Sequence, residues 1–263
     1  MIRSYGGREM MALMRQFAFL LLLALFSITP SGPLAAQTAS SQIFTVQADR
    51  QQLPQSAEAA NIVMAKSAQI LQIRLTKMGG RTVSVQRLGA DQLSVTLSAK
   101  DPEKLLTAAL QGRGALSFHL VNEQLSAEDI EAGKAPTGSI LLPMADGYSK
   151  LAIRQAGALS GKYIVRAQRT FTQGDNMPAV DILLDDEGRQ KFGKMTHANV
   201  GKLIAVVLDG KILTAPRINE PILGGMLQIS GRLSLREADE LAAKLASGSL
   251  PVDFSIVAKR NDQ

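Results

Sequence analysis

Alternating apolar and polar positions in the first half of the chain predict short strands separated by helices. Strands with one buried face are expected at 43–48, 82–87, 92–98 and 115–121. Apolar residues at helical spacing predict helices over 55–78 and 101–111. Gly79 and Gly80 end the first helix, and Asp101 followed by Pro102 is a typical start for the second. This order of strand, helix, strand, strand, helix, strand is the split βαβ, or ferredoxin-like, pattern.

The second half of the chain begins with a segment that prolines and glycines interrupt. We interpret 122–160 as a connector with one short strand near Ile140. Beyond it, strands are predicted at 162–171, 179–185, 202–215, 226–230 and 252–260. Helices are predicted at 185–201 and 234–248, the second opening with a capping box of Ser234 and Glu237. Strands and helices that are mixed in this way indicate an α+β protein.

The segment from Leu208 to Gly225 contains charges and turn residues at a density that suggests an active site. Asp209-Gly210 lies between two apolar runs, which is the strongest short signal for a two-residue hairpin because both residues tolerate positive φ. Pro216 and Pro221 lack backbone donors, so the second strand is expected to lie at a sheet edge or to end there. We therefore interpret this part of the segment as architecture.

The remaining residues of this segment are either turn residues or candidates for contact with a partner. Gly224 and Gly225 are expected to turn the chain into the next strand. Arg217, Asn219 and Glu220 have no structural role that the pattern predicts. These three residues are our candidates for contact with a partner.

The signals for catalysis or cofactor binding are weak throughout the sequence. The chain has no cysteine, which excludes disulfides, thiolate zinc sites and a cysteine nucleophile. His119 is expected to face solvent from a strand and His197 to end a helix, and two histidines are too few for a zinc site. No glycine-rich phosphate loop is present. We predict no catalytic residue, no metal and no cofactor.

An acidic cluster formed by Asp181, Asp185, Asp186 and Glu187 allows two interpretations. The cluster could hold a hard cation such as calcium. It lacks the spacing of an EF-hand loop, so a strand end followed by a helix cap is favoured. A hydrolase that uses paired carboxylates stays as the enzyme alternative.

Net charge and composition narrow the choice of partners. The formal net charge is +6, but lysines and arginines are dispersed, and nucleic-acid binding usually needs a clustered basic face. Aromatic residues make up 4% of the chain and tryptophan is absent, which disfavours base stacking. We expect no nucleic-acid partner.

The N-terminus has the layout of a secretory signal. A start at Met14 is followed by Arg15, by an apolar run from Phe17 to Phe26, and by small residues up to Ala36. We predict a signal peptide over 1–36, either removed after Ala36 or retained as an anchor, and a polar linker over 37–42. The chain is therefore expected outside the cytoplasm, in the periplasm or anchored to the inner membrane.

The motifs of the C-terminal part resemble a known family. The run from Leu203 to Val257 contains Leu-Asp-Gly-Lys, Ala-Pro-x-Ile-x-Glu-Pro-Ile, Gly-Gly, Gln-Ile-Ser-Gly ending at Gly231, and Ser-Gly-x-Leu-Pro. These motifs closely resemble the large periplasmic domain of SecD in the SecD/SecDF protein-export family. Upstream, "LGADQLSVTL", "LSFHLV" and "PAVDILLDDEGRQKFGKMTHANVGK" resemble the same domain. The resemblance covers about 60–257 and is weakest over 123–160.

The resemblance implies a ferredoxin-like split βαβ base with an inserted α+β head domain. On this basis we expect the following parts: a base at 43–121, a connector at 122–160, a head at 161–250, and a return strand with a tail at 251–263. Family members continue into transmembrane helices that carry proton-conducting acids. We expect this chain to be a stand-alone domain without that bundle, so the energised export cycle is not implied for it.

The resemblance implies a non-catalytic protein that binds translocating or unfolded polypeptides, or docks on Sec translocase components. Sheet edges in the head could accept an extended peptide by strand addition. The alternative is an envelope structural or interaction module that kept the fold without the export role.

Overall fold

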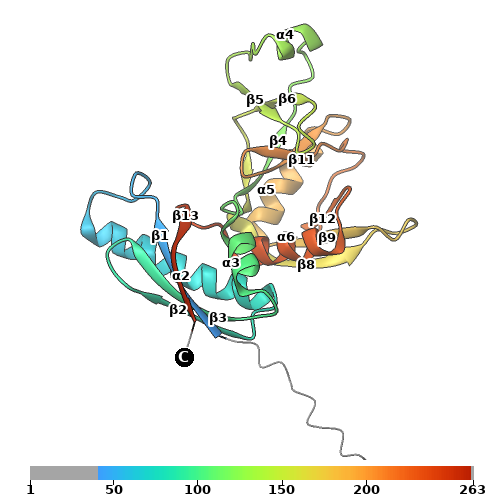
Figure 1. The fold of residues 1–263 in the computed structure, drawn as a ribbon. Helices are drawn as coiled ribbons and strands as arrows, with labels where there is room; N and C mark the ends of the chain where they lie inside the picture. The colour runs from blue at the N-terminus through green and yellow to red at the C-terminus, as the bar shows by residue number, and fades with distance from the viewer. Residues whose placement is uncertain (1–40, 262–263) are drawn as a thin grey trace, which may run out of the picture. The chain divides into compact units, whose positions relative to one another are not determined.

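The computed structural model describes residues 41–261. The predicted signal segment, residues 37–40 of the predicted linker and residues 262–263 lie outside the described residues. Figure 1 shows mixed helices and strands, as the α+β prediction requires.

The first sheet combines the N-terminal strands with the last strand of the chain (Figure 1). It is antiparallel, and its strands in spatial order are β13 (Phe254–Asn261), β1 (Ser41–Ala48), β3 (Gln92–Ser98) and β2 (Thr82–Arg87). Phe44 lies opposite Val95, and Val46 lies opposite Leu93, so these four buried side chains share one face.

Two helices pack on that face. They are α2 (Ala57–Lys77) and α3 (Pro102–Leu110). Leu71 and Leu75 of α2 and Leu106 of α3 are fully buried in the same core as the sheet residues. The predicted start of α3 is confirmed, because the Asp101 side chain accepts a hydrogen bond from the Lys104 amide at 3.1 Å and Pro102 begins the helix.

One strand of the sequence prediction belongs to a different sheet. The expected return strand, β13, does lie beside β1, but the strand after α3, β4 (Leu116–Leu120), which we also expected in this sheet, pairs elsewhere. Gly112 and Gly114, with φ of 74° and 77°, turn the chain between α3 and β4. The prediction was wrong because alternation specifies a strand and its buried face, but not its partner.

A second group of strands follows the turn. One sheet has the spatial order β11 (Lys211–Thr214), β10 (Ile204–Leu208), β4 and β7 (Leu159–Ser160). Another has the order β12 (Met226–Ser230), β9 (Pro178–Leu184) and β8 (Ile164–Phe171). The helices of this second group are α5 (Asp186–His197) and α6 (Leu235–Ser247), and the short 3₁₀ helix η1 (Gly161–Tyr163) precedes β8.

A shared core joins these two sheets and their helices. It contains Phe118 from β4, Val206 from β10, Ile229 from β12 and Leu241 from α6. Phe118 also meets Phe192 of α5 edge to face, with ring centroids 5.2 Å apart. The predicted capping box of α6 is confirmed by reciprocal bonds between Ser234 and Glu237.

The predicted connector contains more structure than the sequence indicated. The strand expected near Ile140 is β5 (Ser139–Pro143), and it pairs with a strand that was not predicted, β6 (Lys150–Arg154). The helix α4 (Ala127–Glu131) precedes them. Ile153 is fully buried against Ala205 and Val207 of β10, so the hairpin packs through β6 on the second group of strands.

A buried arginine joins α2 to both segments that connect the two groups of strands. Arg74 is 0% exposed, and its guanidinium donates to the carbonyls of Ala109 at 2.8 Å, Arg113 at 2.9 Å and Gly248 at 2.9 Å. Burial lowers the pKa of Arg74 to about 10, and the nearby charge of Asp209 opposes this shift. The side chain is therefore charged at neutral pH and supplies hydrogen-bond donors to carbonyls of both connecting segments.

Candidate functional site

An apolar groove lies beside the edge strand β12. It has a volume of about 430 Å³ and is formed by β4, α5, β10, the segment from Pro216 to Gly224, and β12. Its side chains include Phe118, Phe192, Ile204, Val206 and Ile222. Two large apolar residues at its opening, Leu223 and Met226, are 62% and 67% exposed. Exposed apolar side chains that lie together beside a groove can mark a binding surface, whereas single exposed ones are common.

The backbone of β12 is open on one side. β12 pairs only with β9 within the described residues and is the last strand of its sheet. The Leu184 amide donates to the Gly225 carbonyl at 2.9 Å, which sets the alternation of the antiparallel pair. Continued along β12, this alternation turns the N–H and C=O groups of Met226, Gln228 and Ser230 away from β9. An extended chain could pair with these groups.

Of the three residues proposed for partner contact, one lines the groove. Glu220 is exposed and belongs to the groove wall, and Asn219 is exposed beside it. Arg217 donates to the Gly201 carbonyl and lies 3.6 Å from the Glu123 carboxylate. These contacts attach the loop that contains Arg217 to neighbouring segments of the same chain. The structure thus brings Asn219 and Glu220 near the groove and gives Arg217 intramolecular contacts.

The turn residues of the same segment connect or end strands, and only some of them line the groove. Asp209 and Gly210 connect β10 to β11 with φ of 49° and 79°. The strand β11 ends at Thr214, before Pro216, and it is the last strand of its sheet. Gly225 has φ of 68° immediately before β12, with Gly224 preceding it, and Gly231 follows β12. Pro221 lines the groove itself.

Asp209 has a second role that its turn position did not indicate. Its carboxylate accepts hydrogen bonds from the amides of Gly114 at 3.1 Å and Ala115 at 2.9 Å. The hairpin turn is thereby attached to the segment that leads from α3 into β4. The sequence showed the turn, but only the fold shows the long-range bonds.

Both histidines have structural positions. His119 was expected to face solvent, but it is half-buried, with Nδ1 3.0 Å from the Arg154 carbonyl and Nε2 2.9 Å from the Ser117 hydroxyl. The expectation was wrong because β6 covers that face of β4. His197 is exposed at the last position of α5.

The acidic residues near α5 act as caps and ion-pair partners. Asp185 accepts from the Gly188 amide at 2.7 Å, which confirms the cap interpretation. Hydrogen bonds from Lys191 and from the Tyr163 hydroxyl lower the pKa of Glu187. Asp181 accepts from the Gln228 amide group at 2.9 Å. In the described part of the chain, no group of three or more His, Cys, Asp or Glu residues could hold a metal.

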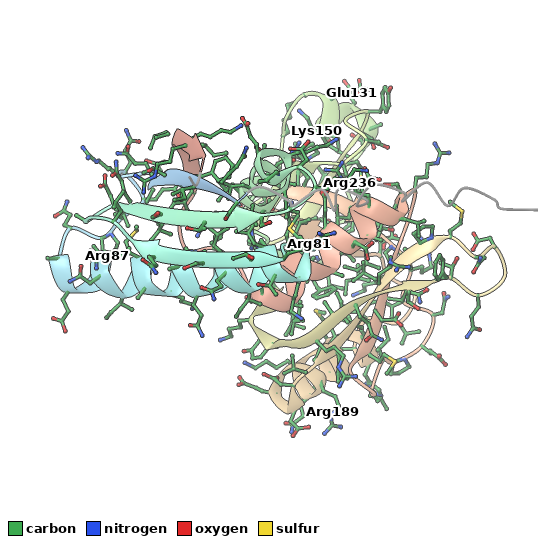
Figure 2. The ribbon with its side chains drawn as sticks, turned by 60° about the horizontal axis from the view of Figure 1, so that its bottom comes forward. Arg81, Arg87, Glu131, Lys150, Arg189 and Arg236 are labelled. Carbon is green, nitrogen blue, oxygen red and sulfur yellow. The ribbon has the colours of Figure 1, made fainter. Side chains whose placement is uncertain are left out.

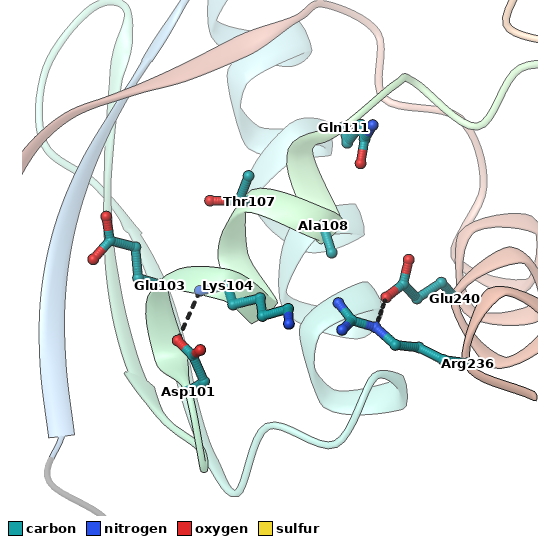
Figure 3. A pocket seen from close by; sticks show the side chains of 8 residues that line it. All are labelled: Asp101, Glu103, Lys104, Thr107, Ala108, Gln111, Arg236 and Glu240. Atoms are coloured by element: carbon teal, nitrogen blue, oxygen red, sulfur yellow. Dashed lines mark hydrogen bonds and ion pairs between the residues drawn. The ribbon is translucent and has the colours of Figure 1, made fainter.

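A second cavity, shown in Figure 3, lies between α3 and α6. It has a volume of about 530 Å³ and is lined by charged residues, including Asp101, Glu103, Arg236 and Glu240. Arg236 pairs with Glu240 at 2.7 Å, and Asp101 caps α3. Glu103 pairs with Lys259 at 2.7 Å. These carboxylates are committed to ion pairs and a cap, so the cavity shows no acid and base poised on a substrate.

Comparison with known proteins identifies the family. The sequence profile of the SecDF P1 head subdomain matches residues 139–252, which include all of β12 and the segment from Pro216 to Gly224. The protein translocase subunit SecD of Rickettsia bellii is 33% identical over 204 residues, covering 78% of this chain and 39% of the relative. Over residues 139–252, the chain carries the P1 head subdomain of the SecD/SecDF family. SecD of Acidaminococcus fermentans is 35% identical over 196 residues, covering 74% of this chain and 39% of that relative.

Solved SecDF structures resemble this fold. A crystal structure of SecDF in a super-membrane-facing form matches with a TM-score of 0.65 and 26% identity, covering 85% of this chain and 30% of SecDF. A structure of SecDF described as a membrane component that enhances protein export matches with a TM-score of 0.62 and 26% identity, covering 82% of this chain and 98% of that one. The chain spans 39% of the length of each of the two SecD relatives named above. None of the helices described for it is long and apolar enough to cross a membrane.

The residues at the groove opening were missed by the sequence interpretation. Leu223, Met226 and Gln228 were assigned only to a turn and a strand. One signal was present, because a large apolar residue, Met226, occupies a position that the alternation of β12 exposes. Such a signal becomes meaningful only when the fold shows that β12 is an edge.

Proposed function

We propose that this chain is an extracytoplasmic polypeptide-binding module of the protein-export apparatus. In this proposal the groove takes an extended segment of a translocating or unfolded polypeptide, which pairs with the open side of β12. The observation that carries the proposal is the coincidence of an unpaired strand edge with exposed apolar side chains. The SecD/SecDF relationship supports a role in export and a location outside the cytoplasm.

Main-chain pairing supplies affinity without sequence specificity, which suits a protein with many clients. Hydrogen bonds to β12 would be the same for every client except at proline. The apolar side chains of Leu223 and Met226 would cover alternate residues of the bound segment. Asn219 and Glu220 would contact polar or basic side chains at the rim.

Substitution of Gln228 tests strand pairing directly. Gln228→Pro removes an N–H that faces the open side, and β12 keeps its bonds to β9, because proline is tolerated at strand edges. Gln228→Ala changes the same side chain and keeps the N–H. For a reduced, carboxymethylated and permanently unfolded protein, we expect Gln228→Pro to raise Kd about tenfold and Gln228→Ala to leave Kd nearly unchanged.

A second pair of variants tests the apolar contacts. Leu223→Asp should weaken binding of the same unfolded protein. Ile62→Asp, at a 64% exposed apolar position on α2, serves as the matched control. Circular dichroism must show native folds for all four variants. Equal affinities for Gln228→Pro and Gln228→Ala would reject strand addition. Loss of binding in the Ile62 variant as well would reject the groove as the site.

A further inference from the structure

The first sheet has a basic end and an acidic end. At the end where β1 begins and β3 and β13 finish, the exposed basic residues are Lys77, Arg81, Lys100, Lys104, Lys259 and Arg260. We call these residues the basic end. The fold brings their segments together, because Ser41 and Thr82 both lie opposite Ser98, and Gln42 lies opposite Asn261.

The other end of the same sheet carries the opposite sign. The acidic residues there are Asp49, Glu58, Asp91 and Asp253, accompanied by Arg50 and Arg87. Backbone bonds from Asp49 to Asp253 and from Ala48 to Asp91 place these loops together. Figure 2 shows Arg81 and Arg87 at opposite ends of the layer formed by the sheet and α2.

The charges of the basic end are mostly uncompensated. Among the ion pairs of the described residues, Glu103 engages Lys259 at 2.7 Å, and Lys77, Arg81 and Lys100 take part in none. Among the other acids near this end in the described range, Asp101 caps the α3 backbone. Asp239 and Glu240 line a cavity together with Lys100 and Lys104, but they pair with Arg169 and Arg236. At the acidic end, by contrast, Arg50 is paired with Asp91. The sheet is therefore polarised, with its free positive charge gathered at one end.

The chain enters the sheet at this same end. Ser41 begins β1, and the predicted apolar run that ends at Phe26 precedes it in the sequence. The intervening residues span at most roughly 50 Å when fully extended. An apolar segment held in a bilayer would keep the basic end near that bilayer. Anionic phospholipid headgroups attract lysine and arginine side chains within about a Debye length of the surface.

We propose that the basic end is a contact surface for an anionic phospholipid bilayer. The sheet would approach the membrane with Arg81 and Lys100 facing the headgroups and with its acidic end pointing away. The inference rests on the proposed location outside the cytoplasm, but not on polypeptide binding in the groove. Each basic side chain near the surface should change vesicle partitioning about fivefold.

Vesicle flotation with the full chain tests this surface. The probe is phosphatidylcholine vesicles with and without phosphatidylglycerol. The double variant Arg81→Gln, Lys100→Gln removes two charges from the basic end. The control double variant Lys134→Gln, Lys150→Gln removes two exposed charges elsewhere, so its net charge equals that of the basic-end variant. The N-terminal apolar run is present in every variant, so differences between variants report the charges.

We expect the basic-end variant to lose about 25-fold in partitioning to anionic vesicles and the control less than threefold, with no difference on phosphatidylcholine alone. Equal losses in the two variants would show a net-charge effect and overturn the proposal. Unchanged vesicle binding with weaker binding of an unfolded protein would assign the basic end to polypeptide instead. Gln228→Pro should leave flotation unchanged, which separates this test from that of the groove.

Labelling gives an independent readout of orientation. The chain contains no cysteine, so a single introduced cysteine can be labelled without background. A fluorophore at Thr82→Cys, at the start of β2, should be quenched by a headgroup quencher in anionic vesicles. The same label at Glu131→Cys on α4 should not be quenched. Equal quenching at both positions would contradict the proposed orientation.

Discussion

Removal of the buried Arg74 side chain should destabilise this fold far more than removal of an exposed arginine. Replacement by methionine keeps an unbranched apolar side chain but leaves the carbonyls of Ala109, Gly112 and Gly248 without the guanidinium donor, whereas the Arg113 carbonyl keeps the Leu250 amide. An unsatisfied buried acceptor costs about 1–3 kcal/mol, so three of them give a gross loss of about 3–9 kcal/mol.

The net loss in the free energy of unfolding is smaller than this gross loss, because the variant does not bury a charged side chain at position 74. The pKa of Arg74, which burial lowers to about 10, indicates that the charged form is disfavoured by roughly 3 kcal/mol relative to water. The expected net loss from Arg74→Met is therefore about 3 kcal/mol.

Equilibrium unfolding in urea, followed by far-ultraviolet circular dichroism, measures the effect. Arg81→Met is the matched control, because Arg81 is exposed and has no ion pair within the described residues. The control should change the free energy of unfolding by less than about 0.5 kcal/mol. Hydrogen exchange should also accelerate at the Leu250 amide, which donates to the Arg113 carbonyl. A loss below 1 kcal/mol for Arg74→Met, or equal losses in both variants, would refute this reasoning.

Two further changes test local claims about Asp209 and Glu237. Asp209→Gly keeps the positive φ available and removes the bonds from Gly114 and Ala115, so it should lower the free energy of unfolding by about 2 kcal/mol in urea titrations. Asp209→Ala should cost about 1 kcal/mol more, because positive φ is then strained; equal losses would contradict this account of the turn. Hydrogen bonds from the Ser234 amide and hydroxyl lower the pKa of Glu237 below its unfolded value. Its contribution is therefore present above the unfolded pKa and disappears as pH falls through the folded pKa. Between pH 7 and pH 3 the wild type should lose slightly more stability than Glu237→Gln, by less than about 1 kcal/mol at this exposed site, and parallel pH profiles would reject the cap contribution.

Local signals predicted local structure well. The cap residues Asp101 and Ser234 lie where the helices begin, and Asp209-Gly210 forms the turn between β10 and β11. These features depend on residues within a few positions of one another, which a sequence pattern records. The α+β class follows from the same signals.

Long-range partners could not be predicted in this way. The alternation of β4 is the same whether it joins the first sheet or the second, so its sheet was assigned wrongly. The half-burial of His119 depends on β6, which no pattern indicated. The groove requires distant segments to meet at β12, and Arg74 looks like an ordinary helix arginine until both connecting segments close around it.

The central claim is that the open side of β12 receives polypeptide during export. A photocrosslinking amino acid at Gln228, incorporated in living cells and activated while export is under way, tests it most directly. The control position is Glu131 on α4, which is exposed and lies outside the residues that line the groove. The account predicts adducts between position 228 and chains in transit, with few or none from position 131. Absence of adducts at 228 during active export, or equal yields at both positions, would contradict it.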